Sequence, residues 1–239
     1  MLRPKKSLSQ NFLTDKNISN KIINLTNIKD KVILEIGPGH GFMTDDILLK
    51  NPKNLILIEK DKTLAGLLKN KYKNKSNVTV LCDDILSYDF SKFINLVVIA
   101  NLPYNISSKV ILYLFNFNKN INEMVLMLQK EMAEKFDYNS HKMNKYKFLT
   151  KLISTYSVCF HVSSSVFFPK PKVKSSVVKF IFDKENFDLD KAIKFSNLIF
   201  KNIRKKINNN IKSNSNNKLL EKRVDQLTVN ELLQIYNLF

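Results

Sequence analysis

The sequence predicts an α/β fold in which a doubly wound parallel sheet is followed by a small helical domain. Short apolar runs alternate with longer, helix-compatible segments as far as about residue 160. Apolar runs without strict polar alternation are typical of strands that are buried on both faces of a parallel sheet. After Phe182 this pattern ends, and the remaining residues have no strand signature.

Five apolar runs are the expected strands of the first part of the sheet. They occupy residues 31–37, 54–60, 78–82, 95–101 and 123–129. The segments between them, such as LAGLLKNKY and SSKVILYLF, are long enough for crossover helices. This alternation of strand and helix indicates the doubly wound sheet. Two later runs, YSVCFHVS and SSVVKFIF, are expected to add two strands around a proline-containing loop.

The chain is expected to divide into two domains, residues 1–183 with the sheet and residues 184–239 with helices. A four-residue repeat of isoleucine predicts one face of a helix in the second domain. Its members are Ile199, Ile203, Ile207 and Ile211. The stretch NNNIKSNSNN is expected to be a loop. Thr228 and Glu231 have the spacing of a capping box, which predicts a final amphipathic helix.

The chain carries a formal net charge of +18, from 39 Lys and Arg residues against 21 Asp and Glu residues. Such a charge usually indicates a polyanionic partner. The abundance of lysine and asparagine also resembles the drift of an AT-rich genome, which is the alternative explanation. Exchanging arginine for lysine leaves the net charge unchanged, however. We therefore expect a nucleic acid as the partner.

The two cysteines and three histidines show no repeated metal-ligand spacing, so we expect neither a disulfide framework nor a metal ion. No apolar run approaches the roughly 20 residues that span a bilayer. The first residues are basic but lack the apolar stretch of a signal peptide. We expect a cytoplasmic setting and no membrane partner.

Three of the four glycines lie in the stretch EIGPGHG, residues 35–41, directly after the first expected strand. Glycine there allows a tight turn and lets a ligand approach the backbone closely. A dinucleotide fingerprint would need a sixth-position glycine at residue 42, where this chain has Phe42. A glycine pattern G-x-G-x-G after an acidic residue is instead that of S-adenosyl-L-methionine (SAM) methyltransferases. A plain turn is the alternative, but one turn rarely needs three glycines.

Two acidic residues at the ends of later strands suit a cofactor with a ribose and an adenine. Glu59 ends the second expected strand, where a carboxylate can accept hydrogen bonds from both ribose hydroxyls. Asp84, in LCDDIL after the third strand, can accept from the adenine amino group. Either residue alone could be a surface acid or a helix cap. Together they indicate a Rossmann-like SAM-binding site, because ligands bind at the carboxyl ends of such strands.

The fourth expected strand ends in Asn101, Leu102, Pro103 and Tyr104. Asn-Pro-Pro-Tyr and its variants are the signature of SAM enzymes that methylate an exocyclic amine of a base. The amino nitrogen of adenine is a poor nucleophile because its lone pair is delocalised into the ring. If the Asn101 side-chain oxygen and the carbonyl of Leu102 or Pro103 each accept one N–H, the lone pair is freed. Tyr104 can stack on the flipped-out base. A capped strand end is the structural alternative.

At these motifs the chain resembles the ribosomal RNA adenine N6,N6-dimethyltransferases across its whole length. The matching stretches are QNFL (10–13), EIGPGHGFMT (35–44), IEKD (58–61), DDIL (83–86), NLPYNISS (101–108) and FFPKPKVKSSVV (167–178). The resemblance implies SAM as methyl donor, no metal, and a Rossmann-like catalytic domain followed by a helical one. It also implies that cofactor contacts come from Asn11, Leu13, Gly37, Glu59, Asp84 and Asn101. Phe167 looks like the family's second stacking aromatic, opposite Tyr104.

Two branches of this family differ in substrate. One dimethylates two adjacent adenosines near the 3′ end of small-subunit (16S) rRNA, and the other methylates a large-subunit (23S) adenine and confers macrolide resistance. MLQKE (127–131) is similar to the first branch, as is the basic stretch IFKNIRKKINNNIK. We therefore expect small-subunit rRNA or a small-subunit particle as the partner of a monomer. A third class consists of relatives that act as non-catalytic nucleic-acid-binding factors. Such a protein could lose the NLPY motif or the glycine motif, but both are intact in this chain.

Lysine clusters are expected to contact RNA phosphates, although a charge run is often only a solvated surface. The clusters are Arg3, Lys5 and Lys6; Lys170, Lys172 and Lys174; and Lys201, Arg204, Lys205 and Lys206. The chain departs from the family at Lys147, where the family usually has glycine. This exchange puts the shape of the loop around it in question.

Overall fold

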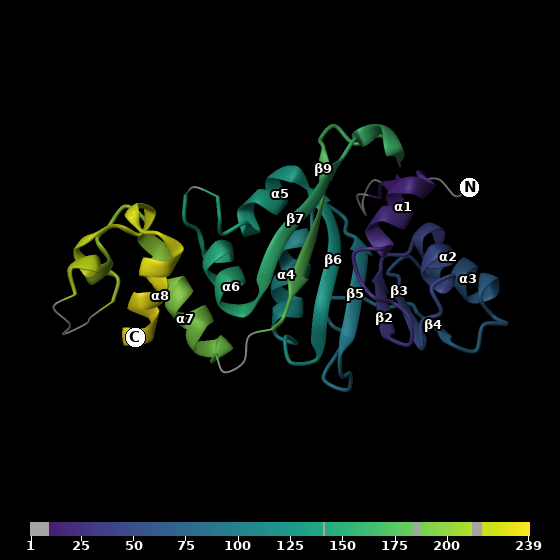
Figure 1. Ribbon diagram of the computed structural model, residues 1–239, viewed down its shortest axis with the longest axis horizontal. Coiled ribbons are helices and arrows are strands. Elements are labelled where there is room, and N and C mark those ends of the chain that lie inside the picture. The colour runs from purple at the N-terminus through teal and green to yellow at the C-terminus, as the bar shows by residue number, and fades with distance from the viewer. Residues whose placement is uncertain (1–9, 141, 184–186, 212–216) are drawn as a thin grey trace. The chain divides into compact units, whose positions relative to one another are not determined.

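The computed structural model describes residues 10–140, 142–183, 187–211 and 217–239 (Figure 1). Arg3, Lys5 and Lys6 lie outside these residues. The chain forms two compact units, which we call the sheet unit (Met1–Ala133 and Ser157–Phe182) and the helical unit (Glu134–Tyr156 and Asp183–Phe239). The division into functional domains at residues 183 and 184 stays a prediction.

The sheet has seven strands in the order β4-β3-β2-β5-β6-β9-β7. Five of them are parallel neighbours: β2 (Val32–Ile36), β3 (Asn54–Ile58), β4 (Val78–Leu81), β5 (Leu96–Asn101) and β6 (Ile121–Gln129). β9 (Ser175–Ile181) pairs with β6 in the antiparallel direction, and β7 (Thr155–Val162) lies at the edge. The expected α/β fold with a Rossmann-like sheet is confirmed, and the sheet is mixed rather than wholly parallel.

The strand order reverses beside β2, because the chain builds β3 and β4 on one side of it and β5 on the other. Ligands of open α/β sheets bind at the carboxyl ends of the strands at such a reversal. Helices α1 (Lys16–Ile23), α2 (Phe42–Leu48) and α3 (Lys62–Lys71) lie on one side of the sheet and α4 (Ser107–Phe115) on the other (Figure 1). The helix α5 (Lys130–Phe136) follows β6.

The strands are apolar throughout because both faces of the sheet are covered. In β3 the four residues from Leu55 to Ile58 are all buried. On the face covered by α1, α2 and α3, side chains from Ile33, Val97 and Val125 pack with those helices in one cluster. Burial of a side chain of this size stabilises a fold by about 1.5–3 kcal/mol. This core fixes the ends of β2, β3 and β5 relative to one another.

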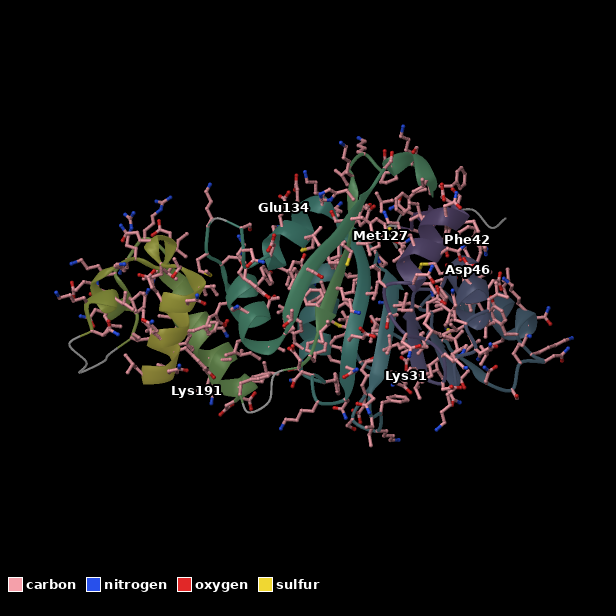
Figure 2. The ribbon with its side chains drawn as sticks, viewed as in Figure 1. Lys31, Phe42, Asp46, Met127, Glu134 and Lys191 are labelled. Carbon is pink, nitrogen blue, oxygen red and sulfur yellow. The ribbon has the colours of Figure 1, made fainter. Side chains whose placement is uncertain are left out.

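A charged contact joins α1 to α2 over this core. The Asp46 carboxylate is 1% exposed and forms an ion pair with Lys16. Ser19 Oγ also donates to Asp46 Oδ2 at 2.5 Å. Phe42 lies one turn before Asp46 on α2 (Figure 2), and the Lys16 ammonium is 5.4 Å from its ring centroid. These contacts with α1 therefore fix the position of α2, which directly follows the glycine-containing residues 37–41.

The helical unit is built around α6 (Lys145–Ile153), α7 (Leu189–Ile199) and α8 (Val229–Leu238). Phe148, Phe195 and Tyr236, one from each helix, have ring centroids 5.3–5.6 Å apart. Thr228 and Glu231 form the expected capping box at the start of α8. Short 3₁₀ turns connect the helices; they are η3 (Phe200–Asn202), η4 (Ile207–Asn209), η5 (Lys218–Glu221) and η6 (Val224–Gln226).

The helical face predicted from the isoleucine repeat is wrong. α7 ends at Ile199, and Ile203 is 48% exposed while Ile207 is fully buried in a separate 3₁₀ turn. Three consecutive cations at residues 204–206 repel one another, and the asparagines at 208–210 favour turns over helix. Among the residues that the structure describes, no helix is long and apolar enough to cross a bilayer.

Candidate functional site

A cavity of about 380 Å³ lies in the sheet unit at the carboxyl ends of β2, β3 and β5, where the strand order reverses. Nine of the ten sequence-predicted site residues line it. They are Asn11, Leu13, Gly37, Glu59, Asp84, Asn101, Leu102, Pro103 and Tyr104. The structure therefore brings together motifs that are up to 93 residues apart in the sequence.

The glycine loop connects β2 to α2, and its residues 37–40 line this cavity. Gly37 has φ +64° in the left-handed region, and a Cβ built there would meet no atom within 4 Å. The backbone of Gly37 therefore faces open space, which a ligand can approach. Gly39 has φ +61°, and a Cβ there would lie 2.8 Å from a ring carbon of Phe12. Glycine at this position makes room for the Phe12 ring.

Phe12 belongs to β1 (Phe12–Leu13), a two-residue strand that pairs with β8 (Phe167–Phe168). The Phe12 ring is 4.7 Å from that of His40, between Gly39 and Gly41 in the loop. The segment QNFL thus covers the glycine loop, a contact that the sequence pattern did not reveal. Its two predicted cofactor residues, Asn11 and Leu13, both line the cavity.

Glu59 follows β3 and is 6% exposed. Its carboxylate accepts from the Gly39 N–H at 3.1 Å and from the Asp61 N–H at 2.9 Å. Burial raises the pKa of Glu59, and these two hydrogen bonds oppose the rise. Each carboxylate oxygen has a further lone pair, so Glu59 can still accept hydrogen bonds from a ligand.

Asp84 lies at a more open part of the cavity. Its Oδ2 accepts from the Lys60 ammonium at 2.7 Å, and its Oδ1 accepts from the Leu86 N–H at 3.0 Å. The hydrogen bond from Lys60 is the main cause that lowers the pKa of Asp84, so the carboxyl is ionised at neutral pH. Lys60 was not among the predicted residues. From the sequence alone, a lysine next to Glu59 could not be distinguished from an ordinary surface lysine.

Asn101 is the last residue of β5, and its side-chain Nδ2 donates to the Asn11 carbonyl at 2.9 Å. A carbonyl can only accept, so this contact orients the amide with Nδ2 toward Asn11. The Asn101 Oδ1 atom is then the acceptor that remains for another partner. The N-terminal segment therefore sets the orientation of Asn101, the first residue of the NLPY motif.

The carbonyls after Asn101 differ in how they are used. The Pro103 carbonyl accepts from the Ile106 N–H at 3.2 Å and from Ser107 Oγ at 2.9 Å. The Leu102 carbonyl accepts no hydrogen bond from the described residues, while the Leu102 N–H donates to the Met127 carbonyl on β6 at 3.2 Å. Of the two backbone acceptors that the sequence left open, Leu102 has the greater remaining capacity.

The hydroxyl groups of Tyr104 and Ser175 are 2.7 Å apart. Ser175 is fully buried at the start of β9, so it is a rigid partner. Burial raises the pKa of Tyr104, which keeps the phenol neutral. Ser175 belongs to the stretch FFPKPKVKSSVV, but nothing in the sequence pairs it with Tyr104.

The structure does not bring Phe167 to the cavity. Phe167 is 4% exposed in the core cluster and is paired in register with Leu13, whereas its neighbour Phe168 is 55% exposed. Successive side chains of a strand point to opposite faces, which explains the difference between these two phenylalanines. The stacking role of Phe167 stays a prediction.

Glu35 was considered only as the acid before the glycines, yet it is the most deeply buried carboxyl group at the cavity. It is fully buried, and its Oε2 accepts from Thr44 Oγ1 at 2.6 Å. Its Oε1 has no hydrogen-bond partner among the described residues. Burial raises the pKa of Glu35 to about 8, so the carboxyl is mostly protonated at neutral pH.

The other predicted features lie away from the cavity. Lys170, Lys172 and Lys174 are exposed between β8 and β9, and Lys201, Arg204, Lys205 and Lys206 are exposed in the helical unit. Lys147 is 3% exposed on α6, and its ammonium donates to the Ser140 carbonyl and hydroxyl at 3.2 and 2.5 Å. No group of three or more metal-ligating side chains occurs within the described parts of the chain.

Known proteins match this chain over almost its whole length. Residues 1–238 match the family model for ribosomal RNA adenine dimethylase. The chain is 38% identical over 245 residues to the ribosomal RNA small subunit methyltransferase A of Hydrogenobaculum sp. (strain Y04AAS1), covering 99% of this chain and 94% of that protein. A dimethyladenosine transferase from Plasmodium falciparum has a TM-score of 0.78 at 27% identity, covering 95% of this chain and 97% of that one. The 23S rRNA methyltransferase ErmE has a TM-score of 0.76 at 18% identity, covering 95% and 98%, and shares the fold. The chain therefore belongs to the ribosomal RNA adenine dimethylase family.

Proposed function

We propose that this protein transfers methyl groups from SAM to the N6 atoms of two adjacent adenosines near the 3′ end of small-subunit (16S) rRNA, as a step in ribosome biogenesis. The observation that carries the proposal is the placement of Asn101. It lies at the cavity end of β5, is oriented by Asn11, and shares one cavity with the glycine loop and two carboxylates. The product of two transfers to one adenosine is N6,N6-dimethyladenosine.

The cavity fits SAM by the chemistry of its lining. Gly37 presents backbone to open space, and Glu59 offers carboxylate lone pairs that suit two ribose hydroxyls. Asp84 is an ionised acceptor that suits the adenine amino group. We assign Asn11 and Leu13 to the methionine end of SAM because they line the cavity beside Asn101. When bound, SAM supplies an electrophilic methyl group on a sulfonium, a chemistry that needs no metal.

Two acceptors are available for the amino group of the target adenine. Asn101 Oδ1 and the Leu102 carbonyl can each accept one N–H, which draws the nitrogen lone pair out of conjugation with the ring. With SAM bound, that lone pair would attack the methyl carbon while the bond from that carbon to sulfur breaks, which releases S-adenosyl-L-homocysteine. The methylated nitrogen would then lose a proton to solvent and become a neutral amine. Tyr104 lines the cavity and is fixed by Ser175, so its ring can stack on the flipped base.

The choice of small-subunit rRNA is supported by the names of relatives that are 36–39% identical to this chain. The methyltransferase of Hydrogenobaculum is named for the small subunit and aligns with nearly the whole chain, and the stretch MLQKE at 127–131 is similar to that branch. A non-catalytic binding factor would not need the intact cavity of Asn101, Glu59 and Gly37. We infer a monomer that acts in the cytoplasm, with exposed lysines contacting RNA phosphates.

The proposal predicts that Asn101→Ala leaves SAM binding largely intact while methyl transfer falls on the order of 100-fold or more, as when a hydrogen bond specific to the transition state is lost. SAM affinity would be measured by calorimetry and transfer by single-turnover labelling of small subunits. Asn118→Ala is the matched control, because it removes an asparagine hydrogen bond, 2.8 Å to the Phe115 carbonyl, at the other end of the parallel strands. Near-normal turnover of Asn101→Ala would refute the role of Asn101.

A further inference from the structure

Phe168 is an exposed aromatic residue that the proposed chemistry does not use. It is 55% exposed, although it forms part of a strand. Single exposed apolar side chains are common on proteins and carry no meaning by themselves. The surroundings of Phe168 therefore decide whether its exposure has a function.

The register of β1 and β8 places Phe168 next to the cavity. Phe12 is paired with Phe168, and Leu13 with Phe167. Paired residues of antiparallel strands point to the same face and lie about 4.5–5.5 Å apart at Cβ. Leu13 and Phe167 face the core, so Phe168 shares the opposite face with Phe12, whose ring lies beside His40 and the glycine loop. Phe168 itself does not line the cavity, but its partner Phe12 does.

The residues that follow Phe168 return to the same cavity. The connection PKPKVK, residues 169–174, leads directly to Ser175, whose hydroxyl is 2.7 Å from that of Tyr104. Both ends of this connection are thus tied to cavity-lining residues, one through Phe12 and the other through Tyr104. Figure 1 shows the segment before β9 beside the start of α1, in agreement with the pairing of β1 and β8.

This connection has the charge that an RNA strand requires. Lys170, Lys172 and Lys174 are all exposed, in a connection that contains bends and neither helix nor strand. No aspartate or glutamate occurs in the sequence between Asp137 and Asp183. An exposed aromatic ring next to a run of cations without carboxylates is the combination by which proteins bind single-stranded nucleic acid.

We propose that Phe168, Lys170, Lys172 and Lys174 form a binding surface for the single-stranded RNA next to the target adenosine. The Phe168 ring stacks on a base that flanks the target, and the three ammonium groups contact its phosphates. The target base itself enters the cavity beside Tyr104. This inference rests on the proposed function in that it takes RNA as the substrate, and it assigns to Phe168 a contact outside the reaction centre.

The test compares Phe168→Leu, which keeps an apolar side chain without a ring, with Phe168→Tyr, which keeps the ring. Affinity for a fluorescent single-stranded oligoribonucleotide would be measured by anisotropy over a range of salt concentrations. Methyl transfer to undermethylated small subunits would give KM and kcat, and calorimetry would give SAM affinity.

We expect Phe168→Leu to weaken oligoribonucleotide binding and raise KM by roughly 5- to 150-fold, the range for the loss of one base-stacking interaction. Its kcat, SAM affinity and salt dependence should remain those of the unmodified protein, and Phe168→Tyr should bind as that protein does. Replacing Lys170, Lys172 and Lys174 with Gln should reduce the slope of log affinity against log salt by about 0.7 for each phosphate that is no longer neutralised.

Equal RNA affinity of Phe168→Leu and the unmodified protein would overturn the inference. A loss of kcat or SAM affinity without a loss of RNA affinity would also overturn it, since the ring would then act on the reaction centre or the fold. The proposed function fails separately, if the unmodified protein transfers no methyl group to small subunits. Even then, the binding of Phe168→Leu and Phe168→Tyr to the oligoribonucleotide still decides whether Phe168 contacts RNA.

Discussion

Glu35, just before the glycine loop, is a buried carboxyl group whose protonation affects the stability of the fold. It is fully buried and accepts one hydrogen bond, from Thr44 on α2, so burial dominates and raises its pKa to about 8. In the unfolded chain its pKa is about 4.5. The folded protein therefore binds this proton more tightly than the unfolded chain, and stability falls as pH rises from about 4.5 to about 8.

Glu35→Gln should remove that pH dependence. We expect little change in the melting temperature at pH 5, where the carboxyl is protonated, and a higher melting temperature than the unmodified protein at pH 9. One pKa unit corresponds to about 1.4 kcal/mol, so the gain at pH 9 is on the order of several kcal/mol. Thermal unfolding at several pH values measures it.

Glu231→Gln is the control with the opposite sign. The hydrogen bond from Lys222 is the main cause that lowers the pKa of Glu231 to about 2, so its stabilising contribution is lost as pH falls. Its replacement should give no gain at pH 9. A Glu35→Gln protein that is destabilised at pH 9 as much as at pH 5 would contradict the assignment.

At the scale of elements, apolar runs allowed the five parallel strands to be predicted, because strands buried on both faces need continuous apolar sequence. The glycine loop, Glu59 and Asp84 were predictable because each follows a strand. β1 and β8 were not predictable, because two-residue strands have no periodicity and their pairing joins residues that are far apart in the sequence, such as Phe12 and Phe168. The helix predicted from the isoleucine repeat does not continue beyond Ile199, because a run of cations and asparagines follows it.

The β1 strand and the glycine loop can be tested together with Gly39→Ala. Alanine there must adopt φ +61° and would place its Cβ 2.8 Å from Phe12, so we expect a loss of about 1–2 kcal/mol or more in unfolding free energy. SAM affinity should fall as well, because the loop must shift away from Phe12. Thermal unfolding and calorimetry measure the two effects.

Gly66→Ala on α3 provides the matched control. A Cβ at Gly66 meets no atom within 4 Å, so alanine should stabilise the helix by up to about 1 kcal/mol. If Gly39→Ala and Gly66→Ala have the same stability and the same SAM affinity, the close packing of Phe12 on the loop contributes to neither.

At the scale of the whole molecule, a net charge of +18 is distributed over both units, and the cavity that we propose as the active site lies in the sheet unit. The charge made a nucleic-acid partner predictable, but it carries no information about which RNA is bound. The membership of 134–156 in the helical unit was not predictable, since those residues pack with a segment that is distant in sequence. The substrate is therefore the property that most needs a direct measurement.

That measurement is methyl transfer from labelled SAM to purified, undermethylated small and large ribosomal subunits, followed by digestion of the RNA and identification of its nucleosides by mass. We predict N6,N6-dimethyladenosine in the small-subunit RNA alone, at two adjacent positions near its 3′ end. Label in the large-subunit RNA would place the protein in the other branch of its family. Absence of label from both subunits, with SAM binding intact, would contradict the proposed function.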